Sequence, residues 1–164
     1  MFPERYLFLL RQQPTGKASL GYGGIQLHSE TELPTAQIGY SVSPGGISLC
    51  TGVPGDWRQE WLVIAHTLSS GEPLILDTTA DSLPILTDFH GQGVWEPWRI
   101  ADSAEGFFQA FSLVLELGLG REHPVALSKN PLPTAMRKST LEAISKSNPH
   151  SDITFWEMLL PTDE

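Results

Sequence analysis

The chain has 164 residues, a mass of 18.0 kDa and a formal net charge of −9 at pH 7. Its 40% hydrophobic and 18% charged residues indicate one folded globular domain and exclude a disordered chain. No apolar run approaches the roughly 20 residues that a membrane span requires. The single cysteine, Cys50, excludes an internal disulfide and favours a reducing compartment, for which we expect the cytoplasm.

Short apolar runs bounded by Gly, Pro, Asp or Ser dominate the first 100 residues. Each run is too short for a helix and is typical of a β-strand. The predicted strands lie at 25–27, 46–49, 61–65, 73–76 and 84–87. Turn residues separate the last three, which predicts a meander of antiparallel strands. The 62–65 run is apolar on both faces, so we expect that strand at the centre of the sheet.

Helical signals accompany these strands. Ser29 and Glu32 have the spacing of a capping box, although a proline two residues later limits that helix to a short one. Asp102 and Glu105 begin a longer predicted helix, whose apolar residues recur every 3.6 positions up to a glycine C-cap. The predicted fold class is therefore α+β, an antiparallel β-sheet flanked by helices in a single domain.

The composition changes after residue 121. Three prolines space out a linker-like stretch, and a helix is predicted from about 134 to 146. A final capped turn carries Phe155, Trp156, Leu159 and Leu160, which are too apolar to stay in water. We expect this tail to dock on the chain's own sheet, and docking on a partner is the alternative.

The negative charge is concentrated in the middle of the chain. Residues 56–122 contain eleven acidic and three basic side chains. Such a field repels phosphate backbones, so direct nucleic-acid binding is not expected, and it attracts a basic partner. The alternative is that the charge only keeps the protein in solution.

The sequence lacks the motifs of common active sites. Gly21-x-Gly23 has no third glycine of a dinucleotide fingerprint, and neither a phosphate-binding loop nor a Gly-x-Ser-x-Gly elbow occurs. Cys50 follows an apolar run in an acidic chain, whereas a catalytic thiol needs an electropositive setting. We therefore expect no enzyme activity, no catalytic residues and no cofactor.

Metal chemistry is the main competing hypothesis. Asp77, Asp81, Asp88 and His90 cluster in the sequence, and His66 lies one predicted strand earlier. Carboxylates and imidazoles bind Zn²⁺, Mn²⁺ or Mg²⁺, so a metal-dependent hydrolase using Asp77, Asp88 and His90 is a lesser alternative. No closely spaced histidine pair supports it, so no metal ligand is assigned. Asp77 follows a strand and most simply caps the next turn.

Four of the five tryptophans lie in the acidic middle segment. Tryptophan is enriched at protein interfaces, where it fills a pocket of the partner. The alternative is that the rings fill the space between sheet and helix, and we favour it for Trp61. The candidate partner-binding residues are Asp56, Trp57, Glu60, Asp88, Trp95, Glu96 and Trp98.

Several segments, in order and spacing, resemble the SMI1/KNR4 (SUKH) superfamily. Trp57-Arg58-Gln59-Glu60-Trp61-Leu62-Val63-Ile64-Ala65 is similar to the family's "W…W.VIG" strand, with Ala65 where glycine is usual. Residues 71–77 resemble its "GDPiflD" strand, and 84–107 its "pVy…HG.G.W….iA.SfeeFl" ending. Residues 32–40 are similar to the family's helix before its first central strand, and residues 3–10 are similar to its opening helix. The positions that we assign to the fold through this motif are Trp61, Asp77, Gly91, Gly93 and Phe107.

The resemblance implies two parts, an SMI1/KNR4-like α+β domain at 1–117 and a linker with a helical extension at 118–164 that packs on the core. It also implies a fold without catalytic residues. Many bacterial members look like immunity proteins that bind and neutralise polymorphic toxins, often nucleases. The expected function is stoichiometric binding of a basic, nuclease-like toxin in the bacterial cytoplasm. The alternative is an adaptor or regulatory protein that binds another cellular protein, as eukaryotic relatives do in cell-wall signalling.

Overall fold

Six antiparallel β-strands form one curled sheet in a computed structural model, which describes residues 1–162. The strands are β1 (Lys17–Leu20), β2 (Gly23–Leu27), β3 (Trp61–Thr67), β4 (Pro73–Asp77), β5 (Ile85–Thr87) and β6 (Trp98–Ala101). They lie in the sheet in the order of the sequence, so each strand pairs with its predecessor. The predicted α+β class and the antiparallel meander are confirmed.

The predicted strand at 46–49 is wrong. This segment makes one isolated bridge, between Val42 and Ser48, and the side chain of Ile47 is 71% exposed. The central strand β3 already pairs with β2 on one side and with β4 on the other. Residues 46–49 therefore find no free edge of β3 to pair with. Conversely, β1 and β6 were not predicted, because neither is a continuous apolar run.

The β3 strand is central and has apolar side chains on both faces, as its sequence predicts. A β-bulge between Val63 and Ala65 shifts the register with β4. Val63 therefore faces one core, while Ile64 and Ala65 both belong to the other.

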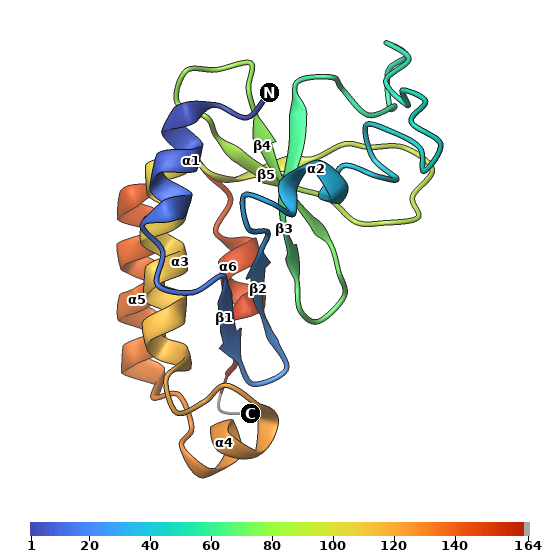
Figure 1. Ribbon diagram of the computed structural model, residues 1–164. Helices are drawn as coiled ribbons and strands as arrows, with labels where there is room; N and C mark the ends of the chain where they lie inside the picture. Colours follow the sequence, from blue (N-terminus) through green and yellow to red (C-terminus); the bar gives the residue numbers. More distant parts are fainter. Residues whose placement is uncertain (163–164) are drawn as a thin grey trace.

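Six helices accompany the sheet in residues 1–162. They are α1 (Glu4–Arg11), α2 (Leu33–Ala36), α3 (Ala104–Gly118), α4 (Pro124–Lys129), α5 (Thr134–Ser147) and α6 (Thr154–Leu159). The long helices α3 and α5 run side by side (Figure 1). None of the helices in residues 1–162 has the length and apolar character needed to cross a membrane.

Helix α3 begins one residue later than its capping pattern predicts. The Ser103 hydroxyl accepts the hydrogen bond from the Gly106 amide at 2.9 Å. Asp102 instead accepts hydrogen bonds from the His150 amide and the Ser151 hydroxyl. At the other end, a β-carbon on Gly118 would lie 2.3 Å from the Ser19 carbonyl oxygen, so glycine permits close contact of α3 with β1.

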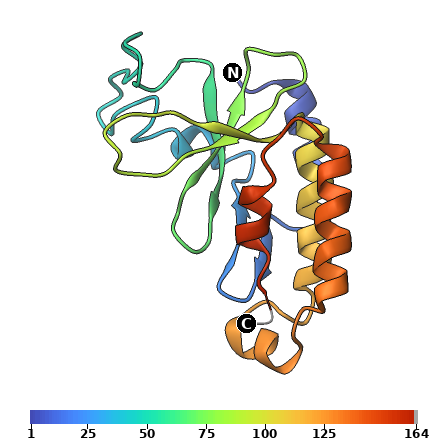
Figure 2. The ribbon, with the colours of Figure 1, turned by 180° about the vertical axis from the view of Figure 1, so that it is seen from behind.

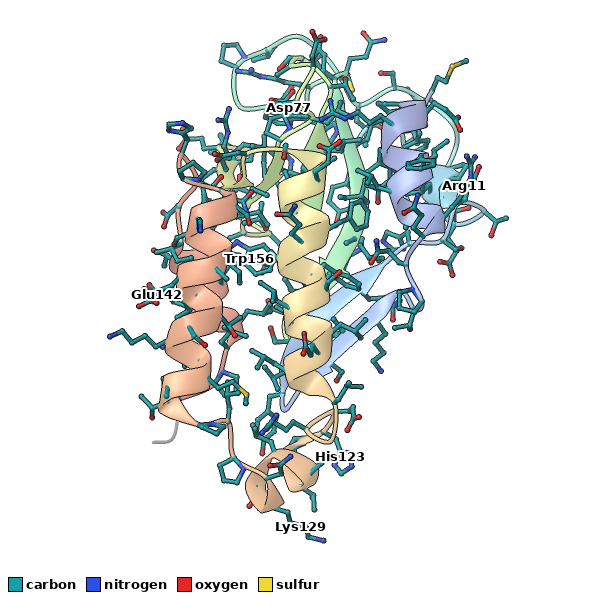
Figure 3. All side chains as sticks on the ribbon, turned by 90° about the vertical axis from the view of Figure 1, so that its left-hand side faces the viewer. Arg11, Asp77, His123, Lys129, Glu142 and Trp156 are labelled. Atoms are coloured by element: carbon teal, nitrogen blue, oxygen red, sulfur yellow. The ribbon has the colours of Figure 1, made fainter. Side chains whose placement is uncertain are left out.

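The C-terminal extension docks on the chain's own core. The Trp156 side chain is fully buried, and its Nε1 donates a hydrogen bond to the Ile100 carbonyl at 2.8 Å. In Figure 3, Trp156 is seen behind α3 and α5, and its ring centroid lies 6.3 Å from that of Phe107 in α3. Part of the stretch predicted as a linker is helix α4, because Pro124 fits a first helical turn and His123 accepts the N-cap hydrogen bond from the Ala126 amide. The larger core includes residues from both parts of the chain, which makes one domain.

A second, smaller core lies on the opposite face of the sheet. It contains the buried residues Trp57, Trp61, Val63, Ile75 and Leu86. Two long segments cover it: residues 37–60, here called the α2–β3 connection, and residues 88–97, here called the β5–β6 connection. Both extend away from the helical layer (Figure 1).

Candidate functional site

The two connections are joined at the point where the candidate interface residues lie. The Trp95 amide donates a hydrogen bond to the Gly55 carbonyl at 2.7 Å. The rings of Trp57 and Trp95 meet edge to face, with centroids 5.0 Å apart. The structure thus brings Asp56, Trp57, Trp95 and Glu96 together from segments about 40 residues apart.

Two of the candidate partner-binding residues lie in the interior rather than on the surface. The Trp57 side chain is 3% exposed, and its Nε1 donates to the Trp61 carbonyl at 3.0 Å. Asp88 is 6% exposed, and its two oxygens accept hydrogen bonds from the amides of Phe89 and Glu96. Both are therefore corrections: Trp57 fills the second core, and Asp88 holds the two ends of the β5–β6 connection together.

The other candidates divide between two places. Asp56, Glu60, Trp95 and Glu96 belong to the joined connections, where Glu60 and Glu96 are exposed and their carboxylates accept no hydrogen bond within residues 1–162. Trp98 is half-buried on β6 and packs against Phe89, with ring centroids 5.1 Å apart. Trp61 is 5% exposed and belongs to the core, as its sequence favours.

Sequence reasoning missed the exposed aliphatic side chains of the connections. Val53 and Val94 are 59% and 48% exposed; Val94 packs against Gly55, and Val53 lies two residues before that glycine in the chain. In the chain, Asp56 follows Val53 by three residues and Glu96 follows Val94 by two. We call these four residues the connection surface. Isolated valines carry no interface signal in a sequence, since only the fold shows that both are exposed and that their segments are joined.

A continuous chain of hydrogen bonds runs behind this surface and joins four histidine or tyrosine side chains to a carboxylate. His28 Nε2 lies 2.7 Å from His66 Nδ1, and the Tyr40 hydroxyl lies 3.0 Å from His66 Nε2 and 2.8 Å from His90 Nε2. His90 Nδ1 in turn lies 2.8 Å from a Glu72 carboxylate oxygen. The five residues come from five different segments of the chain, and we call them the polar chain.

Proton counting gives the polar chain a direction. The Glu72 carboxylate only accepts, so His90 donates through Nδ1, and a neutral His90 accepts from Tyr40 at Nε2. Tyr40 then accepts from His66, and His66 accepts from His28. A proton added at His90 Nε2 would reverse the three bonds between His90 and His28, whereas the bond to Glu72 would keep its direction.

Burial shifts the pKa values in this group. It lowers the pKa of His66 to about 4, with additional repulsion from His28 and His90. Burial also lowers the pKa of His28, and it raises the pKa of Tyr40 to about 12, with a smaller contribution from Glu72. At neutral pH, His66 and His28 are therefore neutral hydrogen-bonding groups rather than charges.

The three residues of the metal hypothesis do not form one site. Leu76 pairs with Ile85 and Leu74 with Thr87, so Asp77 and Asp88 lie at opposite ends of the β4–β5 pair. The Asp77 carboxylate accepts hydrogen bonds from the amide and hydroxyl of Thr79, which is the expected turn cap. Within residues 1–162, no group of three or more His, Cys, Asp or Glu residues is arranged to hold a metal ion.

No protein-family model, curated protein or solved structure matches this chain. The similarity to the SMI1/KNR4 superfamily therefore stays a prediction from its sequence motifs.

Proposed function

We propose that the protein is a non-catalytic binding protein, an immunity protein of a bacterial polymorphic toxin system that binds a basic, nuclease-like toxin stoichiometrically. The observation that carries this proposal is the connection surface, where exposed Val53 and Val94 belong to two segments joined at Gly55, each with a carboxylate within three residues in the chain. An apolar centre with a polar rim is the usual anatomy of a protein interface.

The support beneath this surface favours tight binding. Edge-to-face contacts of Trp57 with Trp61 and Trp95, at 5.6 and 5.0 Å between centroids, fix the connections on the sheet. The Trp95–Gly55 backbone hydrogen bond closes the joint. A surface that is already ordered loses little conformational entropy on binding, so more of the contact energy appears as affinity.

Charge supports a basic partner. Several carboxylates of residues 56–122 have internal partners, such as Glu105 with Arg5, but Glu60 and Glu96 make no ion pair within residues 1–162. Together with the eleven-to-three excess of acidic residues in this segment, they leave a negative field near the surface. Such a field accelerates association with a positively charged partner and competes with phosphate for its binding site.

The test is binding to the toxin domain encoded beside the gene. We expect a one-to-one complex and loss of toxin activity when the two proteins are mixed. Val94→Arg should weaken the complex by about 10-fold or more, because it places a cation at the apolar centre. Val125→Arg is the matched control: Val125 is 59% exposed on α4, at the far end of the molecule from the connections (Figure 1).

Charge reversal provides a second arm. Glu96→Lys should slow association, most strongly at low salt, whereas Glu116→Lys on the exposed side of α3 should have a smaller effect. Equal effects at the two positions, or no complex at all with folded protein, would contradict the proposal. A complex with an unrelated cellular protein in place of a toxin would favour the adaptor function.

A further inference from the structure

A groove of about 340 Å³ lies where the C-terminal extension meets the sheet. Phe155, Met158 and Leu159 of α6 form one wall, and Leu20, Phe89 and Trp98 line the strand side. Figure 2 shows α6 beside the β1–β2 and β3–β4 turns that border it. The volume and the aromatic lining are those of sites for small organic ligands.

Within residues 1–162, large apolar side chains at the rim of this groove are exposed. Tyr22, Phe89 and Met158 have exposed fractions of 83%, 47% and 63%. These are three of the large apolar side chains that residues 1–162 leave in solvent, and all three border the same groove. Gathered exposed apolar side chains indicate a binding site more strongly than scattered ones do.

The charged residues of the lining are both acidic. Glu72 and Asp88 line the groove, and no Lys, Arg or His does. Both Asp88 oxygens accept hydrogen bonds from backbone amides, so that carboxylate adds charge but offers no open acceptor. In Glu72, one oxygen accepts from the His90 amide and ring, and the other accepts no hydrogen bond within residues 1–162.

We propose that this groove binds a small organic ammonium ion, such as an aromatic amine. Its apolar body would lie between α6 and the rings of Phe89 and Trp98, and its ammonium group would bind the open oxygen of Glu72. A carboxylate attracts the cation, aromatic faces stabilise it further, and an anion of the same shape would be repelled. The site needs the extension, because α6 supplies one wall. It lies outside the connection surface and does not depend on the toxin-binding proposal.

The experiment compares three probes that share a phenylethyl group and differ in charge: 2-phenylethylamine, 2-phenylethanol and 3-phenylpropionate. Each is titrated into ¹⁵N-labelled protein while amide chemical shifts are followed. We expect the amine to shift the amides around Glu72, Phe89 and Met158 and to bind at least about 5-fold more tightly than the alcohol. The carboxylate probe should bind most weakly.

Variants assign the preference to the groove. Glu72→Gln keeps the shape of the side chain and should abolish the difference between amine and alcohol. Glu60→Gln, an exposed carboxylate of the α2–β3 connection, is the matched control and should preserve it. Phe89→Ala should weaken the binding of all three probes. Unchanged amide chemical shifts elsewhere in the spectrum show that each variant is folded.

Three results would overturn the proposal. They are equal affinity of the wild-type protein for amine and alcohol, shifts confined to residues outside the groove, and no shift with amine up to about 10 mM. Because the toxin is not a component of this experiment, its outcome is separate from that of the immunity hypothesis.

Discussion

Individual carboxylates in the acidic middle of this chain have different roles that their sequence neighbours do not reveal. Asp102 accepts a hydrogen bond from the amide of His150, 48 residues away, and Asp88 accepts one from Glu96. Glu96 itself remains exposed. Charge counting therefore predicted the acidic field, but it could not separate carboxylates that hold the fold from those available to a partner. Long-range hydrogen bonds make that distinction.

Asp77→Ala should lower the free energy of unfolding by about 1 kcal/mol, because the Thr79 amide and hydroxyl lose their acceptor. Chemical denaturation measures the change. Asp81→Ala is the control in the same turn, since the exposed Asp81 carboxylate accepts no hydrogen bond within residues 1–162. Unchanged stability together with weaker partner binding would instead assign Asp77 to the interface.

Tyr6→Phe should raise the free energy of unfolding, by about 1 kcal/mol. The Tyr6 side chain is fully buried, and its hydroxyl has no hydrogen-bond partner within residues 1–162. Removing that hydroxyl avoids the cost of taking it out of water while the ring still packs against Phe108. Tyr22→Phe, at a side chain that is 83% exposed, should leave stability unchanged. Destabilisation by Tyr6→Phe would mean that the hydroxyl is hydrogen-bonded in solution.

Among the helices and strands, those with a strong apolar pattern in the sequence could be predicted. Those that depend on pairing with another strand could not. The apolar runs predicted β2 to β5, and the 3.6-residue period predicted α3 and α5. β1 and β6 are short strands at the edges of the sheet, and their pairing with β2 and β5 makes them strands. The prolines at 124, 131 and 133 predict a linker, but proline is allowed in a first helical turn, and helix α4 begins at Pro124.

Trp156→Ala tests whether α6 is part of the core. The change should destabilise the protein by about 3–5 kcal/mol, since it empties a fully buried site and leaves the Ile100 carbonyl without its donor. Met158→Ala in the same helix is the control, because that side chain is 63% exposed and should cost little. Thermal or denaturant unfolding distinguishes the two. Equal, small effects would show that the extension is only loosely attached.

For the whole molecule, the polar chain connects the sheet with both connections. His66 lies on β3, Tyr40 in the α2–β3 connection and His90 in the β5–β6 connection. Neutral His66 donates to Tyr40 at Nε2 and accepts from His28 at Nδ1, so a second proton on His66 would place two donors against each other at the His28 contact. The connection surface thus rests partly on groups that titrate below neutral pH.

Stability should therefore fall as the pH drops from about 6.5 to 4. The pKa of His66 is lowered to about 4 in the folded protein, whereas an unfolded chain protonates its histidines near pH 6.5, so the unfolded state binds the proton first. The full shift corresponds to roughly 3 kcal/mol, and partial solvent exposure of the ring reduces the expected loss to about 1–2 kcal/mol. His28, whose pKa burial also lowers, contributes with the same sign.

Unfolding curves at several pH values in this range measure the effect. His66→Gln should flatten the dependence, and His150→Gln, at an exposed position, should leave it unchanged. The facing groups are His28, Tyr40 and His90, with Glu72 beyond His90. An equally steep dependence in the His66 variant would assign the titration to other groups.

The sequence alone determined the α+β class, the central position of the 62–65 strand, the main helix and the acidic middle segment. These depend on local periodicity and composition, which a chain carries whatever its neighbours are. Only the tertiary structure decided that Trp57 and Asp88 are buried, that the segments of exposed Val53 and Val94 are joined, and that α6 forms a groove with the sheet. Each of these three features depends on contacts between segments far apart in the chain. A β-bulge, a turn or a docked helix brings those segments together.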